Sequence, residues 1–271
     1  MRAVLVNGIA PAEDTRGVDV RDRGLNYGDG LFETMALQQG RVRFLDAHLQ
    51  RLESGCARLG IVFPGAALLQ ADISAMVSSQ QNGVVKIVIT RGIGGRGYRP
   101  GNEATATRIV TLHDHPTSTS NDIAVRWCDM RLSRNPALAG IKHLNRLEQV
   151  LAQGEWGDPH VEEGLMIDYE GELVCGTSSN IFLVRNGELL TPDLRYCGVR
   201  GIMRAAVINA AKELNIPVHE EPLWPDDLEG AAEVFLTNAV RGVRAVIALN
   251  ERTWERGVVT RSICKALDLH A

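Results

Sequence analysis

The chain has 271 residues, of which 45% are apolar and 23% charged, and its formal net charge is −4. This composition is typical of a soluble globular protein with one large or two modest domains, and the acidic balance argues against nucleic acid or an anionic membrane as partner. The apolar run at the N-terminus is too short for a signal peptide, and no stretch approaches the length of a membrane span. Five scattered cysteines suit reduced thiols, so we expect a cytoplasmic protein.

The first half of the chain predicts an N-terminal α/β domain over residues 1–114. Residues 31–44 predict a β-hairpin that turns at Gln38-Gln39-Gly40, and apolar residues three or four apart predict a helix from Leu45. The other elements expected in this half are strands at 3–7, 84–90 and 108–112 and a helix at 66–79.

The second half predicts a larger domain over residues 123–271. It follows the polar segment 115–122, which has no hydrophobic period and is the expected interdomain linker. Strands and helices mix without strict βαβ alternation, so the fold class is α+β with two domains. The elements expected here are strands at 123–127, 164–168, 172–174, 181–184, 233–237 and 243–249 and helices at 143–153, 199–214 and 257–267.

Two motifs suggest a bound group and are set aside. The glycines of Gly92-Ile93-Gly94-Gly95-Arg96-Gly97 match a dinucleotide fingerprint, but the Pro100-Gly101 that follows opposes the helix which that site requires. A loop that contacts anions, or a plain flexible loop, fits better. His113 and His115 flank Asp114 at the linker edge, where solvated histidines are expected rather than a metal site.

The chain has only four lysines, and one of them stands out as a candidate nucleophile. Lys212 and Lys265 lie on polar helix faces, and Lys86 alternates within a strand, which suggests an edge or snorkelling side chain. Lys142 falls between a small-residue loop and a helix, where shielding from water would lower the pKa of its amine. Spacing alone makes Lys142 the best candidate nucleophile among the four lysines but does not assign it a role.

Four stretches, spread over nearly the whole chain, carry a resemblance to a known family. They are residues 22–34, 48–52 and 140–151, and residues 176–182 with 198–204. Together they resemble the fold-type IV enzymes that use pyridoxal 5′-phosphate (PLP), a group that includes branched-chain and D-amino-acid aminotransferases and aminodeoxychorismate lyases. The resemblance implies the D-amino-acid aminotransferase-like fold, PLP as cofactor and a homodimer.

The resemblance assigns the cofactor contacts residue by residue. Lys142 would bind PLP through a Schiff base, and Arg51 would bind the phosphate with its planar guanidinium. Ser178 belongs to the same cofactor-binding set. The main-chain amides of Gly201, Ile202 and Met203 would meet the phosphate at a helix start, and Thr237, Asn238 and Ala239 at a strand end would complete the phosphate site.

One position departs from the family pattern. Fold-type IV enzymes usually place a glutamate against the pyridine nitrogen, and here that position is Cys175. Glu172 lies three residues upstream and would need a shift of register to replace it. A thiol supports a protonated ring nitrogen poorly, which disfavours transamination more than an elimination that ends in an aromatic ring. A small buried residue with a water at the nitrogen is the simpler alternative.

Within this family, residues 140–151 and Gly94–Tyr98 resemble the lyases more than the aminotransferases. This implies conversion of 4-amino-4-deoxychorismate to 4-aminobenzoate and pyruvate in folate biosynthesis, with Lys142 as the base and Thr34 as a candidate proton donor. Tyr27, Arg96 and Tyr98 would bind the substrate, the last two through its carboxylates. An aminotransferase of the same fold is the main alternative. A nucleotide-dependent oxidoreductase and an inactive PLP-binding protein are the others.

Overall fold

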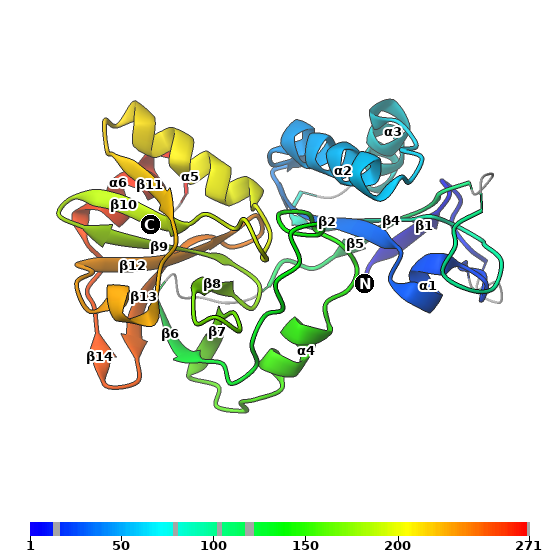
Figure 1. Ribbon diagram of the computed structural model, residues 1–271. Helices are drawn as coiled ribbons and strands as arrows, with labels where there is room; N and C mark the ends of the chain where they lie inside the picture. The colour runs from blue at the N-terminus through cyan, green and yellow to red at the C-terminus, as the bar shows by residue number, and fades with distance from the viewer. Residues whose placement is uncertain (13–16, 78–80, 102–104, 117–121, 270–271) are drawn as a thin grey trace. The chain divides into compact units, whose positions relative to one another are not determined.

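The computed structural model describes the chain outside residues 13–16, 78–80, 102–104, 117–121 and 270–271. The chain forms two compact units, each a mixture of helices and strands, and this confirms the predicted α+β class (Figure 1). Unit 1 comprises Met1–Thr117 with Ile141–Asn145, and unit 2 comprises Ser118–Gly140 with Arg146–Ala271. Most of the predicted linker 115–122 lies outside the described residues.

Unit 1 is a five-stranded antiparallel sheet in the order β1-β5-β4-β2-β3, with the helices α2 and α3 packed on it. Figure 1 shows both helices on one face of this sheet. The predicted hairpin and the helix from Leu45 are confirmed as β2–β3 and α2. The elements are β1 (Ala3–Val6), α1 (Arg23–Tyr27), β2 (Gly30–Gln38), β3 (Arg41–Val42), α2 (Leu45–Leu59), α3 (Ala66–Val77), β4 (Gly83–Thr90) and β5 (Thr107–His113).

Strand β2 presents different side chains on its two faces, because neighbouring residues in a strand point to opposite sides. Leu31, Glu33 and Met35 are buried and share one face, whereas Phe32 and Thr34 are partly exposed and share the other. Glu33 contacts α2 through its side chain, so the buried face is the one that the helices cover. The opposite face of β2 therefore stays accessible in unit 1.

Unit 2 is built on a larger mixed sheet in the order β11-β10-β9-β12-β13-β6-β7-β8, with β14 paired to β13. Three of its pairings are parallel, namely β10 with β11, β13 with β6 and β6 with β7. The elements are β6 (Asp122–Trp127), α4 (Leu147–Gln153), β7 (Val161–Ile167), β8 (Leu173–Gly176), β9 (Asn180–Arg185), β10 (Glu188–Pro192), α5 (Ile202–Glu213), β11 (Val218–Glu221), the 3-10 helix η1 (Pro225–Leu228), β12 (Glu233–Asn238), β13 (Gly242–Leu249), β14 (Arg252–Thr253) and α6 (Val258–Ala266).

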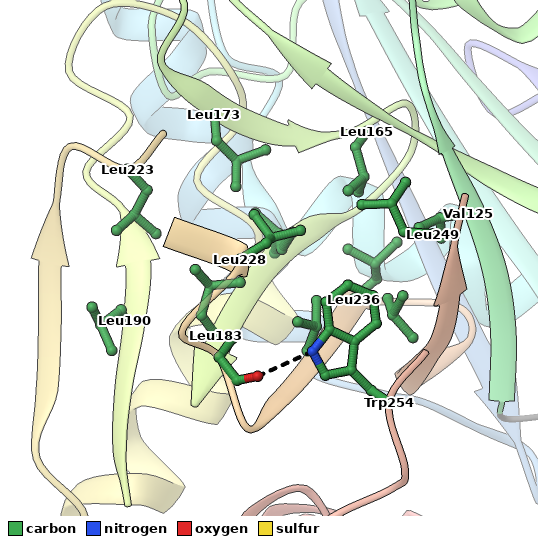
Figure 2. Close-up of a cluster of buried hydrophobic side chains, with 14 of the residues drawn as sticks. Val125, Leu165, Leu173, Leu183, Leu190, Leu223, Leu228, Leu236, Leu249 and Trp254 are labelled. Carbon is green, nitrogen blue, oxygen red and sulfur yellow. Dashed lines mark hydrogen bonds between the residues drawn. The ribbon is translucent and has the colours of Figure 1, made fainter. Parts of the chain in front are cut away.

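Neighbouring side chains along β9 and β12 point to opposite faces of the sheet, and the core of unit 2 lies on both faces. Phe182 and Phe235 stack with ring centroids 5.0 Å apart in the cluster that α5 and α6 cover. The next residues along these strands, Leu183 and Leu236, enter a second cluster on the other face, where the Trp254 indole donates to the carbonyl of Ala231 at 3.1 Å (Figure 2). The sheet is therefore buried on both sides, which holds its strand ends in fixed positions.

The segment around Lys142 departs from the prediction in two ways. The helix expected over 143–153 begins only at Leu147, and residues 141–145 belong to unit 1 rather than to the predicted C-terminal domain. The amide of Phe32 donates to the carbonyl of Lys142, and the amide of Leu144 donates to the carbonyl of Gly30, both at 3.0 Å. These bonds hold the segment extended beside β2, and backbone bonded in this way is not available to a helix.

Candidate functional site

Lys142 lies on the accessible face of the unit 1 sheet. Its Nζ atom is 4.4 Å from the centroid of the Phe32 ring, which is a cation–π distance. The segment that carries it is bonded to β2 through main-chain groups, so the backbone position is fixed while the side chain remains only partly buried. The structure thus presents this amine from a rigid element.

Two further polar groups share this face with Lys142. Thr34 follows Phe32 by two residues and lies opposite Lys86 in the β2–β4 ladder. The Nζ atom of Lys86 is 5.3 Å from the centroid of the same Phe32 ring. The predicted catalytic pair Lys142 and Thr34 is therefore brought to one face, together with a second cation. Of the two interpretations of Lys86 from the sequence, the edge position is wrong, because β4 lies inside the sheet between β5 and β2.

Arg51 is held in a buried charge cluster on the helix-covered face. Its Nε and Nη2 atoms donate to the Glu33 carboxylate at 2.8 and 2.5 Å, and His48 Nδ1 lies 2.6 Å from the same carboxylate. Burial raises the pKa of Glu33, but the hydrogen bonds from His48 and Arg51 outweigh it and hold that pKa below 4.5. The guanidinium therefore faces a charged carboxylate, which fixes the side of the guanidinium that carries Nε and Nη2. Its contact with a phosphate stays a prediction.

The three predicted substrate-binding residues gather around the glycine-rich loop of unit 1. The amide of Gly97 donates to the Tyr27 hydroxyl at 3.2 Å, and the Tyr27 and Tyr98 rings meet edge to face with centroids 5.6 Å apart. Arg96 and Tyr98 are exposed. A dinucleotide site requires a helix directly after the loop, and residues 98–101 form none. The dinucleotide interpretation is therefore excluded for the described residues, and contact of this loop with an anion stays a prediction.

In unit 2, the N-terminus of α5 lies beside the end of β12. Asn180 pairs with Thr237 across the β9–β12 ladder, and its Oδ1 atom accepts a hydrogen bond from the Gly201 amide at 3.2 Å. A Cβ atom on Gly201 would lie 2.1 Å from that oxygen, so only glycine fits there. No side chain caps α5, whose first amides, including those of Ile202 and Met203, lack partners within the helix.

Thr237 places a buried hydroxyl group at this corner. The residue is 2% exposed, and its Oγ1 atom has no hydrogen-bond partner among the described residues. Such an atom carries a desolvation cost unless a ligand completes it. The side chain of Asn238, by contrast, accepts hydrogen bonds from the amides of Val240 and Arg241 at 3.1 and 2.8 Å, and so fixes the turn that contains Ala239.

Ser178 is fixed by a buried carboxylate that sequence reasoning missed. Glu163 accepts hydrogen bonds from the Ser178 amide at 3.1 Å and from the Ser178 hydroxyl at 2.8 Å, and a further bond from the Thr177 hydroxyl. The guanidinium of Arg244 lies 3.3 Å from the same carboxylate. Neither residue belongs to the stretches that carried the family resemblance, and only the strand pairing places them beside this turn.

Cys175 is buried in a cluster with Cys128 and Met166. Burial raises the pKa of its thiol, and the Arg146 guanidinium opposes this only in part, so the thiol is neutral at physiological pH. Glu172 is engaged in ion pairs with Arg134 and Arg195, at 3.0 and 3.4 Å. The shift of register that would let Glu172 replace the missing glutamate therefore does not occur.

These features fit PLP on observations of this chain alone. Within unit 1, a lysine amine can bond to an aldehyde. Within unit 2, taken by itself, a buried hydroxyl with no partner among the described residues lies beside an uncapped helix start, which suits a phosphate. The described part of the chain contains no helix that is long and apolar enough to cross a membrane.

Comparison with known proteins gives concordant matches over most of the chain. A sequence profile of the family described as Amino-transferase class IV matches residues 30–249. The solved structure of 4-amino-4-deoxychorismate lyase from Pseudomonas aeruginosa superimposes with a TM-score of 0.92 and 43% identity, covering 97% of each chain. Aminodeoxychorismate lyase from Vibrio harveyi is 31% identical over 90% of each chain, and D-alanine aminotransferase from Bacillus licheniformis is 28% identical over 97% of this chain and 95% of its own. The chain therefore belongs to the class IV aminotransferase family, whose fold-type IV members are PLP-dependent enzymes.

Proposed function

We propose that the protein is an aminodeoxychorismate lyase, which converts 4-amino-4-deoxychorismate to 4-aminobenzoate and pyruvate for folate biosynthesis. The observation that carries this proposal is the accessible face of β2, where Lys142, Thr34 and Lys86 surround Phe32. This face offers a base, a hydroxyl proton donor and a cation. The similarity to two lyases, at 43% and 31% identity, supports it.

PLP, when bound, supplies an electron sink that is conjugated to the amine of the substrate. Lys142 would hold the cofactor and then, as a free amine, remove the proton from the amine-bearing carbon. The carbon–oxygen bond of the enolpyruvyl ether breaks as the ring becomes aromatic. A proton from the Thr34 hydroxyl or from Lys142 would complete the departing enolpyruvate as pyruvate. An aminotransferase needs no such second proton donor for a leaving group.

Lys86 would add electrostatic binding to this face. The substrate carries carboxylates. The attraction between a lysine and a carboxylate is stronger near a protein surface than in bulk water, because the effective dielectric constant is lower there. Arg51, Ser178, Gly201, Ile202, Met203, Thr237, Asn238 and Ala239 remain the proposed cofactor contacts, with Cys175 at the ring nitrogen. A neutral thiol at that position supports elimination better than transamination, because the aromatic product itself drives the loss of the proton.

A fold-type IV aminotransferase is the second candidate, since D-alanine aminotransferase is similar over nearly the whole chain. The two activities are separated by incubating the holoenzyme with 4-amino-4-deoxychorismate, or with a D- or branched-chain amino acid and 2-oxoglutarate. We expect pyruvate and 4-aminobenzoate in equal amounts from the first reaction. Amino transfer without pyruvate release would overturn the lyase proposal in favour of the aminotransferase.

The role of Lys142 is tested by substitution. Lys142→Ala should lose both turnover and the PLP adduct that borohydride reduces onto the protein, which mass spectrometry detects. Lys212→Ala, on the exposed face of α5, is the matched control and should keep both. A full-yield adduct in Lys142→Ala would exclude this lysine as the attachment site.

We also propose that the protein is a homodimer. Helix α4 exposes three large apolar side chains, Leu147, Val150 and Leu151, each more than half exposed. A cluster of this kind on one short helix is typical of a surface that another chain covers. Light scattering should give twice the chain mass of 29.6 kDa, and Leu151→Glu should shift it toward the monomer. A wild-type monomer at micromolar concentration would contradict this proposal.

A further inference from the structure

Arg23 is a buried arginine beneath the glycine-rich loop of unit 1. It begins the short helix α1 and is 3% exposed. Moving a guanidinium out of water is costly, and a well-packed apolar residue often serves stability as well or better. A charged side chain in this place therefore needs a reason beyond packing, and its hydrogen bonds supply one.

The guanidinium of Arg23 binds the loop through its main-chain carbonyl groups. Nη1 donates to the carbonyl of Gly97 at 2.9 Å, and Nη2 donates to the carbonyl of Tyr98 at 2.8 Å. Nε donates to the Asp29 carboxylate at 2.9 Å. The planar fork thus spans two successive peptide groups on one side and a carboxylate on the other, a geometry that a lysine ammonium cannot reproduce.

Main-chain contacts hold the start of the same loop. The Arg23 amide donates to the carbonyl of Gly92 at 2.9 Å, and the Gly94 amide donates to the carbonyl of Arg21 at 3.3 Å. A Cβ atom on Gly94 would lie 2.6 Å from Cδ of Arg23, so the glycine lets the loop approach the arginine closely. Together with the bond from the Gly97 amide to Tyr27, these contacts fix the loop on both sides of Arg96.

Asp29 connects this arrangement to the body of unit 1. Besides Arg23, its carboxylate accepts two hydrogen bonds from Arg91, at 2.7 and 3.0 Å. Arg91 in turn donates to the carbonyls of Leu59 and Gly60 at the end of α2. Burial raises the pKa of Asp29, but Arg91 and Arg23 together lower it, so the carboxylate stays charged and holds both guanidinium groups.

We propose that Arg23 is a positioning residue that preorganises the loop Gly92–Tyr98, so that Arg96 and Tyr98 meet a carboxylate of the substrate without first being ordered. The proposal rests on the proposed lyase function for the identity of that substrate. The loop contains four glycines, and a chain of this kind pays a large entropic cost when a ligand has to order it. Arg23 orders the loop when the protein folds, and its effect therefore falls on substrate affinity rather than on the chemical step.

The first test needs no substrate. The Arg96–Gly97 bond is a tryptic site inside the loop, and cleavage at this bond measures how often the loop opens. In Arg23→Gln, we expect cleavage there to accelerate about tenfold or more, as a loop with fewer anchors opens more often. Arg21→Gln removes an adjacent, exposed arginine that pairs with Asp19, and it should be cut at the wild-type rate. Equal rates for Arg23→Gln and wild type would overturn the proposal.

The second test separates binding from chemistry. For Arg23→Gln and Arg23→Lys holoenzymes we expect KM for 4-amino-4-deoxychorismate to rise about tenfold while kcat changes less than about threefold, as for lost uniform binding. The absorption band of bound PLP should not change. An Arg23→Lys variant with wild-type KM would show that charge alone suffices, and a fall in kcat with loss of PLP would indicate a general structural role. Either result would overturn the positioning role.

Tyr27→Phe keeps the test valid if the arginine variants fold poorly. It removes only the hydroxyl that accepts from Gly97, on a partly exposed ring, and should raise tryptic cleavage in the same direction but less. Its KM does not enter the test, because Tyr27 is itself a proposed substrate contact. An unchanged cleavage rate in this variant would count against the anchored loop. If the wild type does not turn over the substrate at all, the proposed function fails, and the cleavage rates alone then decide the role of Arg23.

Discussion

The charge cluster of Glu33, His48 and Arg51 makes a sharp prediction about stability. Glu33→Gln keeps the shape of the side chain but removes the charge that faces Arg51 and one of the acceptors that its carboxylate offers. Both the carboxylate and His48 are 1% exposed, and the Arg51 side chain is 14% exposed, so water replaces the lost bonds poorly. Breaking a buried ion pair from one side costs about 3–5 kcal/mol, and we expect about 2–4 kcal/mol here because the amide oxygen still accepts one bond.

Denaturant unfolding monitored by circular dichroism measures this loss as a lower midpoint at unchanged slope. Glu53→Gln is the matched control, because it removes the same charge from an exposed position on α2 and should cost less than about 0.5 kcal/mol. A loss below about 1 kcal/mol in Glu33→Gln would show that the cluster is solvated or rearranged in solution, and would refute the reasoning.

The pH dependence gives a second check on the same cluster. The pKa of Glu33 is lower in the folded protein than its ordinary value of 4.5, so its stabilisation is complete above about pH 4.5 and is lost as the pH falls through the folded pKa. The difference in stability between wild type and Glu33→Gln should therefore be constant near neutral pH and narrow in acid. A difference that widens in acid would contradict the assigned sign.

Three further predictions follow from single contacts in unit 2. Thr237→Val should weaken PLP binding to the apoenzyme about tenfold, measured by fluorescence titration, without lowering its thermal stability, because Oγ1 has no partner among the described residues. Glu163→Gln should destabilise the protein by about 2–3 kcal/mol in denaturant unfolding, because it leaves Arg244 facing a neutral amide and weakens the Thr177–Ser178 turn. The thiols of Cys128 and Cys175 should resist Ellman's reagent in the native protein at pH 8 and react after unfolding, because burial raises the pKa of Cys128 to about 12 and that of Cys175 as well; rapid native labelling of either would contradict their burial.

Local sequence patterns predicted much of the fold. The hairpin 31–44, the helix from Leu45 and the strands near 84–90 and 243–249 all follow from hydrophobic period and turn residues, and the structure confirms them. The patterns failed where tertiary pairing overrides the local period. β10 and β11 were missed, and residues 143–145 look helical by spacing but lie in an extended segment beside β2.

The sequence by itself determined the candidate chemistry of this protein. Four lysines, one of them in a motif of its family, single out Lys142, and the motif positions point to Thr34 and to the loop with Arg96 and Tyr98. Short motifs are enough to identify these candidates, because an amine, a hydroxyl or a guanidinium is recognised from the residue type alone.

Only the tertiary structure decided which residues support that chemistry. Lys86 joins Lys142 because the register of β4 against β2 sets it opposite Thr34, and Arg23 holds a loop more than 70 positions further along the chain. Such partners are set by register and burial across distant segments, and a shift of one residue in the pairing of β4 with β2 would turn Lys86 away from the face that Thr34 occupies. No local pattern contains that choice, and it becomes visible only when the sheet is assembled.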